Sequence, residues 1–329
     1  MQYITVNTID SKQLQLSKFI MGGSFSRNTP EEETFALIDR YRELGGNTID
    51  TARAYGGIED QLSYGRCEAR FGDYIRARGC RDQLHVITKG GFPTLYPDFS
   101  FKRWRITREA ILGDFYTSYD NLRIGPIDLY LLHRDDPEKP VSYIMDILNE
   151  IVKSGDVRAI GVSNWSLDRV LEANAYADSI GMPRLVINEI QWGYAYLNHE
   201  MRNDPSVSIM NPALYRQYET HKLPIISFTS QDSGLWSYLY SGKETWDTLK
   251  PSRKMYDCPV NRKKYEKVKA YCDEHHVSPA ALITAYLACN KVTCGPIIGC
   301  HTMQQLEDSM SGASLTLDQS VIDWMDDVE

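Results

Sequence analysis

Four side chains that lie far apart in the sequence together have the chemistry needed to protonate a carbonyl oxygen: Asp50, Tyr55, Lys89 and His133. A tyrosine with an unperturbed pKa of about 10 is a poor proton donor at neutral pH. We expect the Lys89 ammonium to lower the pKa of Tyr55, and Asp50 to keep Lys89 charged. His133 would donate a hydrogen bond that positions the carbonyl oxygen. This set predicts carbonyl reduction, or the reverse alcohol oxidation, without a metal ion.

Each of these side chains also has a simpler interpretation when it is considered alone. Asp50 and Lys89 could form a structural ion pair, because such pairs are common in proteins and also perturb titration. Tyr55 could be a loop aromatic residue, and His133 could be a histidine of the core. The catalytic interpretation therefore requires a fold that brings the four together.

The four residues lie at or just after the ends of predicted strands. Short β-rich apolar segments alternate with longer segments of helical period along the chain, which indicates repeated βα units. We predict strands at 19–22, 47–51, 85–89, 128–133, 157–163, 186–191, 225–229 and 296–299. Helices are expected between them, at 31–44, 61–78, 107–122, 141–154, 166–180, 212–221 and within 262–290.

Eight strands that alternate with helices predict an α/β fold, a (β/α)₈ TIM barrel formed as a single domain by residues 1–329. No linker rich in Gly, Ser or Pro divides the chain. Residues 3–16 alternate apolar and polar around a turn, which predicts an N-terminal β-hairpin outside the repeat. The active site of such a barrel lies at the C-terminal ends of its strands, where Asp50, Lys89 and His133 are expected.

Composition argues against several other classes of protein. The chain has 36 Lys and Arg residues against 44 Asp and Glu residues, and no dense basic run, so we expect no nucleic-acid partner. No apolar run approaches the roughly 20 residues of a membrane helix, and the N-terminus has no signal-peptide pattern. We therefore predict a soluble, cytoplasmic protein. The seven scattered cysteines suggest reduced thiols, and His275-His276 lacks the partners of a metal site.

Longer motifs around the four residues resemble the aldo/keto reductase superfamily. They are GGNTIDTARAYG at 45–56, ITK at 87–89, DLYLLH at 128–133 and GDVRAIGVSN at 155–164. They occur in the order and approximate spacing of the family, and the resemblance covers nearly the whole chain. It implies a (β/α)₈ barrel that reduces carbonyl groups with NAD(P)H, with Asp50, Tyr55, Lys89 and His133 as its catalytic tetrad.

The same resemblance implies a cofactor site. Ser163 and Asn164 would bind the nicotinamide carboxamide with Gln191 as a third contact, and Phe228 stands where the family usually has a ring-stacking tyrosine. Further cofactor residues are expected after the first, seventh and last barrel strands, the last group including adenine contacts: Gly23 and Ser24; Ser230, Gln231, Gly234 and Leu235; and Gly299, His301, Thr302, Gln305 and Asp308.

The choice between NADP(H) and NAD(H) depends on the segment after the last strand. Relatives that select NADP(H) usually have Lys or Arg there, because the 2′-phosphate requires a cation or a bidentate donor. This chain has His301 and Thr302 instead, with Glu307 and Asp308 nearby. The resemblance thus implies NADP(H), and the missing cations leave NAD(H) or dual use open.

Three loops, at 90–106, 193–211 and 231–261, are expected to form the substrate pocket. They and the strand ends carry several aromatic and polar side chains: Phe92, Trp104, Trp192, Tyr194, Trp236, Tyr240, Arg53, Arg134 and Asp135. We expect a small-molecule carbonyl substrate, polar and sugar-like, with a small hydrophobic or aromatic carbonyl as the alternative. A dinucleotide-binding regulatory or sensor subunit with little turnover is the other class of function, and the complete tetrad argues against it. The sequence predicts no oligomeric state.

Overall fold

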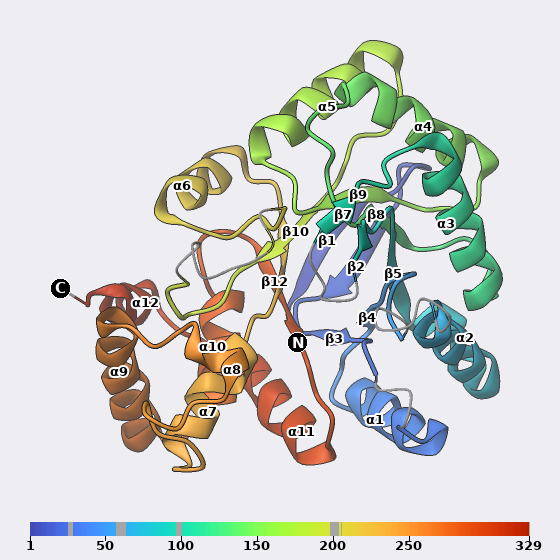
Figure 1. Ribbon diagram of the computed structural model, residues 1–329. Helices are drawn as coiled ribbons and strands as arrows, with labels where there is room; N and C mark the ends of the chain where they lie inside the picture. The colour runs from blue at the N-terminus through green and yellow to red at the C-terminus, as the bar shows by residue number, and fades with distance from the viewer. Residues whose placement is uncertain (26–28, 57–63, 97–100, 198–203, 205, 329) are drawn as a thin grey trace.

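The centre of the molecule is a closed barrel of eight parallel strands, in the order β10-β11-β12-β3-β4-β5-β8-β9 (Figure 1). The computed structural model describes residues 1–25, 29–56, 64–96, 101–197, 204 and 206–328. The barrel strands are β3 (Ile20–Gly22), β4 (Thr48–Asp50), β5 (His85–Gly90), β8 (Leu129–Leu132), β9 (Ile160–Ser163), β10 (Asn188–Gln191), β11 (Ile225–Phe228) and β12 (Cys294–Ile298). All eight lie within or overlap the predicted segments, so the predicted barrel is confirmed.

Helices surround the barrel (Figure 1). They are α1 (Glu31–Glu43), α2 (Arg66–Arg78), α3 (Arg108–Leu122), α4 (Val141–Ser154), α5 (Leu167–Ile180), α6 (Pro212–His221), α7 (Leu235–Tyr240), α8 (Pro251–Lys254), α9 (Pro259–His275), α10 (Pro279–Ala288), α11 (Met303–Ser311) and α12 (Gln319–Asp326). The stretch predicted within 262–290 is two helices, because His276 adopts a left-handed conformation and the Ser278 side chain caps α10. Residues 61–63 of the helix predicted at 61–78 lie outside the described residues.

Four elements were not predicted as helices. All four are short, and they are α7, α8, α11 and α12, the last of which follows the final repeat. A second small hairpin, β6 (Thr94–Leu95) with β7 (Phe101–Arg103), lies in the loop after β5. None of the helices in the described part of the chain is long and apolar enough to span a bilayer.

The predicted N-terminal hairpin closes one end of the barrel. It consists of β1 (Tyr3–Asn7) and β2 (Gln13–Ser17), whose side chains alternate between exposed and buried. Its buried face packs into the barrel interior against aliphatic side chains of the strands: Ile4, Val6, Leu14 and Leu16 against Ile20, Ile87, Leu129, Leu131, Ala159, Ile187 and Ile226. Each buried aliphatic side chain contributes roughly 1.5–3 kcal/mol. A polar site therefore has room only at the opposite, C-terminal end.

The strands change from apolar to polar toward that end. On β5 the inward residue Ile87 is followed two positions later by Lys89, and Ile187, just before β10, is followed by Glu189 and Gln191 on that strand. Side chains two residues apart point to the same side of a strand. These polar groups therefore point into the barrel interior, closer to its C-terminal end than the aliphatic side chains that pack against the hairpin.

Candidate active site

Barrel closure brings the four predicted catalytic side chains together. The Nζ atom of Lys89 on β5 lies 2.6 Å from both carboxylate oxygens of Asp50 on the neighbouring strand β4. It also lies 5.2 Å from the centre of the Tyr55 ring. The Tyr55 ring in turn meets the His133 ring edge to face, with 5.9 Å between their centroids. The four residues thus form one contiguous cluster.

A second carboxyl group belongs to this cluster, and the motifs did not point to it. Glu189 on β10 is 2% exposed, and its Oε2 atom lies 3.3 Å from Lys89 Nζ. Burial alone would lower the pKa of Lys89, but Asp50 and Glu189 raise it well above its usual value. The lysine is therefore a permanent cation between two acids.

The net effect of these surroundings on Tyr55 differs from the expected one. Burial raises the pKa of Tyr55 to about 12, and the favourable effect of Lys89 only partly offsets it because Asp50 and Glu189 act in the opposite direction. Burial, with help from Arg134 and Lys89, lowers the pKa of His133 well below its usual value. The imidazole is therefore neutral at physiological pH, with one nitrogen able to donate and the other to accept.

The residues expected to hold the nicotinamide lie at the mouth of the barrel. Asn164 donates hydrogen bonds to the His133 carbonyl oxygen (3.2 Å) and to Ser163 Oγ (2.9 Å). Ser163 Oγ donates to the backbone carbonyl of Glu189 at 3.0 Å. The buried Gln191 Oε1 atom has no hydrogen-bond partner among the described residues. A buried acceptor without a partner is costly. Gln191 Oε1 is therefore suited to accept a hydrogen bond from the NH₂ group of a carboxamide.

Phe228 is paired with Gln191 across β10 and β11 and is partly exposed. Its ring is thus available for stacking. Gly23 is buried and its N–H donates to the Asp50 carbonyl at 2.7 Å, so this amide is used within the barrel. A Cβ atom at Gly23 would lie 2.4 Å from the Phe71 ring, which gives this glycine a packing role. Ser24 beside it is exposed.

A groove of about 930 Å³ continues from the seventh and eighth strands over the outside of the barrel. Most of the cofactor residues predicted after those strands line it: Ser230, Gln231, Gly234, Gly299, His301, Thr302, Gln305 and Asp308. Leu235 differs, because its side chain is fully buried in the core and does not line the groove. Lys243 and Arg253 also line it, which the sequence did not predict.

The loop after β11 has several residues in left-handed backbone conformations. Thr229, Asp232 and Ser233 have φ values of 53°, 52° and 57°, and Gly234 has 79°. Such left-handed conformations alternate with right-handed ones in backbone turns that bind phosphate, and they are strained for residues other than glycine. The side chain of Ser230 is already bound to the Ile297 carbonyl, and the N–H groups of Asp232 and Gly234 donate to the carbonyls of Thr229 and Gln231. An anion here would therefore be bound by the other amides of the loop.

Two of the expected adenine-side residues also cap a helix. Thr302 Oγ1 accepts from the Gln305 N–H at the start of α11 (3.2 Å), and Gln305 Oε1 accepts from the His301 N–H (2.8 Å). This arrangement resembles a capping box. Glu307 is paired with Arg40 of α1 at 2.8 Å, which offsets its negative charge.

The whole length of this barrel matches one known family. The model of the aldo/keto reductase family matches residues 19–329. The chain belongs to the aldo/keto reductase family. It is therefore an NAD(P)-dependent oxidoreductase that acts on carbonyl groups, and members of this family generally use NADP(H).

Several relatives match this reductase, two of them over more than nine tenths of its length and one over about half. The norsolorinic acid reductase stcV of Emericella nidulans is 27% identical over 94% of this chain and 76% of its own length. The aldo-keto reductase ausK of the same organism is 26% identical over 96% of this chain and 77% of its own. The aldo-keto reductase YhdN of Bacillus subtilis is 29% identical over 52% of this chain and 49% of its own.

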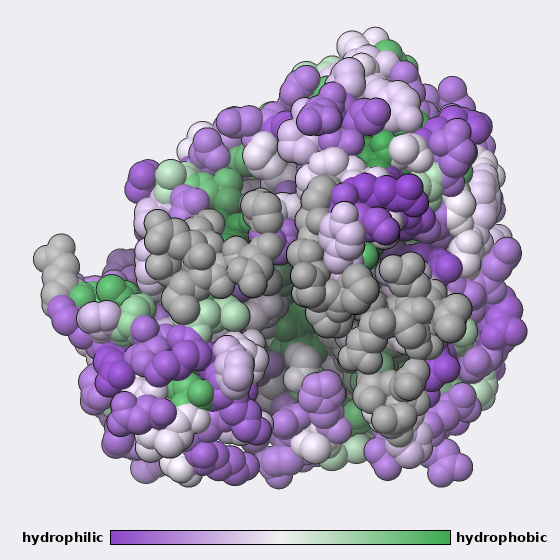
Figure 2. Space-filling model, in the orientation of Figure 1, coloured by the Kyte–Doolittle hydropathy of each residue, from purple (hydrophilic) through white to green (hydrophobic). Residues whose placement is uncertain are grey.

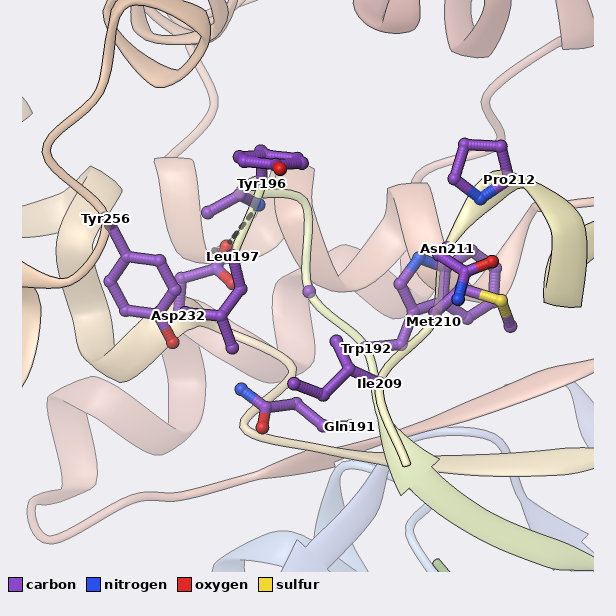
Figure 3. A pocket seen from close by; sticks show the side chains of 12 residues that line it. Gln191, Trp192, Tyr196, Leu197, Ile209, Met210, Asn211, Pro212, Asp232 and Tyr256 are labelled. Atoms are coloured by element: carbon purple, nitrogen blue, oxygen red, sulfur yellow. Dashed lines mark hydrogen bonds between the residues drawn. The ribbon is translucent and has the colours of Figure 1, made fainter. Parts of the chain in front are cut away.

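A cavity of about 380 Å³ adjoins Gln191 in the reductase. In Figure 3, Tyr256 and Leu197 lie on one side of it, Met210 and Pro212 on the other, and Gln191 below. Most of its lining side chains are apolar or aromatic. Figure 2 shows hydrophobic residues at the base of a hollow near the centre of this face, and mostly hydrophilic residues over the outer part of the face.

Two aromatic residues expected to wall the substrate pocket belong to the core instead. Tyr194 and Trp236 are almost fully buried and pack together, with ring centroids 5.3 Å apart. The buried Asp232 accepts hydrogen bonds from Trp236 Nε1 (2.6 Å) and from the Ala195 N–H (2.9 Å). Asp232 thus ties the loop after β10 to the loop after β11. A side chain at Gly193 would collide with it, since a Cβ there would lie 1.9 Å from Asp232 Oδ1.

Proposed function

We propose that this reductase reduces a carbonyl compound with Tyr55 as the proton donor and Lys89, Asp50 and His133 as its catalytic partners. The observation that supports these roles is the contiguous cluster of the four side chains at the open end of the barrel. The bound nicotinamide supplies the hydride. Neutral His133 orients the carbonyl oxygen by hydrogen bonding, and Tyr55 protonates the developing alkoxide while Lys89 stabilises the phenolate that remains.

The pKa of Tyr55 in the free protein supports a donor that is activated late in the reaction. A phenol with a pKa of about 12 keeps its proton at neutral pH. An alkoxide is a much stronger base than a phenolate, so proton transfer becomes favourable only when negative charge has developed on the substrate. After the transfer, Lys89 stabilises the negative charge on the Tyr55 phenolate.

For the cofactor, we propose that Gln191, with Ser163 and Asn164, binds the carboxamide, that Phe228 stacks on the ring, and that the loop at 229–234 binds the pyrophosphate. The adenine half would lie in the groove that Thr302, Gln305 and Asp308 line. Gly23 and Ser24 would flank the nicotinamide, and Gly299 and His301 the ribose. Leu235 can contribute only its backbone, because its side chain is in the core.

We propose dual use of NADPH and NADH. The side chains at His301 and Thr302 provide no permanent positive charge to a 2′-phosphate, and Arg253 is already paired with Glu244. Lys243 is the exposed lysine of the groove lining and would supply a modest preference for NADPH.

For the substrate, the cavity beside Gln191 favours the aromatic alternative over the polar, sugar-like carbonyl. Two of the polar side chains expected to contact a sugar already have protein partners: Arg134 binds Ser206 (3.0 Å) and Asp204, and Asp135 is paired with Arg169 at 2.6 Å. Arg53 keeps two buried N–H groups without a partner in the described chain, so a polar substituent near Tyr55 is compatible. The name of one relative, a probable aryl-alcohol dehydrogenase of Saccharomyces cerevisiae, agrees with an aromatic substrate.

The experiment is a titration of tryptophan fluorescence with NADPH and NADH, followed by turnover on a panel of aromatic and sugar-derived carbonyl compounds. We expect both cofactors to bind, and aromatic aldehydes or ketones to be reduced faster. Turnover confined to the sugar-derived compounds would reverse the substrate proposal. Cofactor binding without turnover on the whole panel would favour a sensor subunit.

A further inference from the structure

Glu189 is a buried acid that the four-residue mechanism does not use. It lies on β10, where its backbone pairs with Ser163 of β9 and Ile226 of β11. Its side chain points across the barrel interior to Lys89 of β5, with 3.3 Å between Oε2 and Nζ. Although Oε2 is buried, it has no hydrogen-bond partner with good geometry among the described residues.

The net charge of the buried cluster determines whether Glu189 is protonated. Lys89 is held by Asp50 through two contacts of 2.6 Å, so the pair is already neutral. A second carboxylate at 3.3 Å would give the cluster a net negative charge in a site where all three side chains are at most 2% exposed. Burying an uncompensated charge is strongly unfavourable. The cluster therefore retains one proton, and Glu189, the more weakly paired acid, is where it resides.

We propose that Glu189 is a positioning residue of the reductase, which at neutral pH holds a proton and so leaves the positive charge of Lys89 directed at Asp50 and Tyr55. Loss of that proton would add a negative charge beside Lys89 and disfavour the Tyr55 phenolate. The inference rests on the proposed function, since it concerns the same tyrosine. In this proposal, ionisation of Glu189 sets the upper pH limit of carbonyl reduction.

The neighbours of Glu189 support this assignment. The titratable groups that face it are Asp50 on β4, Lys89 on β5 and Tyr55 in the loop after β4. The adjacent strands β9 and β11 present Ser163 and Ile226, which do not titrate in this range. Burial and the nearby Asp50 raise the pKa of Glu189 to about 8, with Lys89 opposing them.

The test is the pH profile of kcat at saturating NADPH for the wild type and for Glu189→Gln, which imitates the protonated acid. If the ionised form is inactive, a group with a pKa of about 8 predicts that wild-type kcat falls roughly tenfold between pH 7 and pH 9. We expect that fall to be at least about threefold smaller in Glu189→Gln. The same fall in both proteins would overturn the proposal.

Glu68→Gln is the matched control. Glu68 of α2 is also fully buried, with hydrogen bonds from Thr88 (2.6 Å) and Asn121 (3.0 Å), but it lies outside the tetrad. We expect it to keep the wild-type ratio of kcat between pH 7 and pH 9. A shift of the profile by Glu68→Gln as large as that by Glu189→Gln would show a general effect of removing a buried acid, and would also overturn the proposal.

A readout independent of turnover is the carboxylic-acid C=O band in pH-difference infrared spectra. We expect the wild type and Glu68→Gln to lose such a band as the pH rises from 7 to 9, and Glu189→Gln to lack it. The wild-type spectrum also tests the proposal if Glu189→Gln does not fold, because absence of the titrating band would refute it. If the wild type shows the band but reduces no carbonyl compound, the proposed function fails while the protonated Glu189 stands.

Discussion

The Lys89 Nζ atom lies 2.6 Å from both carboxylate oxygens of Asp50, and both side chains are almost fully removed from solvent. The two residues are 39 positions apart in the sequence and meet because β4 and β5 are neighbours in the barrel. A buried ion pair contributes little net stability compared with a hydrophobic pair, but removal of one partner leaves an uncompensated charge.

Lys89→Met should destabilise the protein and change how its stability depends on pH. Without the cation, two buried carboxyls remain, and we expect the free energy of unfolding at pH 7 to fall by roughly 3–5 kcal/mol. Both acids would have raised pKa values in the folded state, so the folded protein is most stable below the unfolded pKa values and loses stability as the pH rises. Urea denaturation at pH 5 and pH 7 measures this, with the exposed Lys291→Met as control. Equal losses in both variants would contradict it.

Tyr55→Phe should abolish proton donation and leave the cofactor site intact. The ring that contacts His133 and Lys89 remains, while the hydroxyl is lost. We expect kcat for carbonyl reduction to fall about 10²–10⁴-fold, with NADPH affinity close to that of the wild type by fluorescence titration. If turnover persisted at the wild-type rate, another group would have to donate the proton.

Asp232→Asn should remove a pH dependence of stability in the acid range. Burial raises the pKa of Asp232 to about 6, from an unfolded value near 3.8. A raised pKa means that the folded state binds this proton more tightly, so stability is greatest below about pH 4 and falls as the pH rises to about 6. The difference in unfolding free energy between wild type and variant should shift by roughly 2 kcal/mol between pH 4 and pH 7. Denaturation of the exposed-site control Asp327→Asn should show no such shift.

Lys243→Ala should weaken NADPH binding selectively. An exposed charge contact contributes up to about 1 kcal/mol, so we expect the Kd for NADPH to rise about fivefold and the Kd for NADH to stay unchanged. Added salt should reduce the difference between wild type and variant. Titrations with both dinucleotides, and with Lys291→Ala as control, measure it. An equal rise for both cofactors would place Lys243 away from the 2′-phosphate.

Much of the molecule was predictable because the information is local. The eight strands follow from short apolar segments between helical ones, and the N-terminal hairpin from its alternation around a turn. Asp50, Lys89 and His133 lie at strand ends that a parallel barrel must gather at one side. The sequence could also have indicated Glu189 as a residue of the site. It lies two residues before Gln191, on the same face of a buried strand, where an unpaired charge is costly.

Other features depend on contacts between distant segments. Tyr194 and Trp236 are aromatic residues in loops, which favoured a place in the wall of the substrate pocket. In the structure they lie in the core, because they pack against each other and Trp236 donates a hydrogen bond to the buried Asp232. The net direction of the Tyr55 pKa shift also depended on tertiary structure, because burial outweighs Lys89 once Asp50 and Glu189 are close.

The sequence by itself determined the eight barrel strands, the helices between them and the end of the barrel that carries polar side chains, since these follow from residue patterns a few positions long. Only the tertiary structure decided that Lys89 stands between two acids and that Lys243 lines the same groove as Thr302. Barrel closure sets those distances, and electrostatic effects depend on distance and burial rather than on separation along the chain.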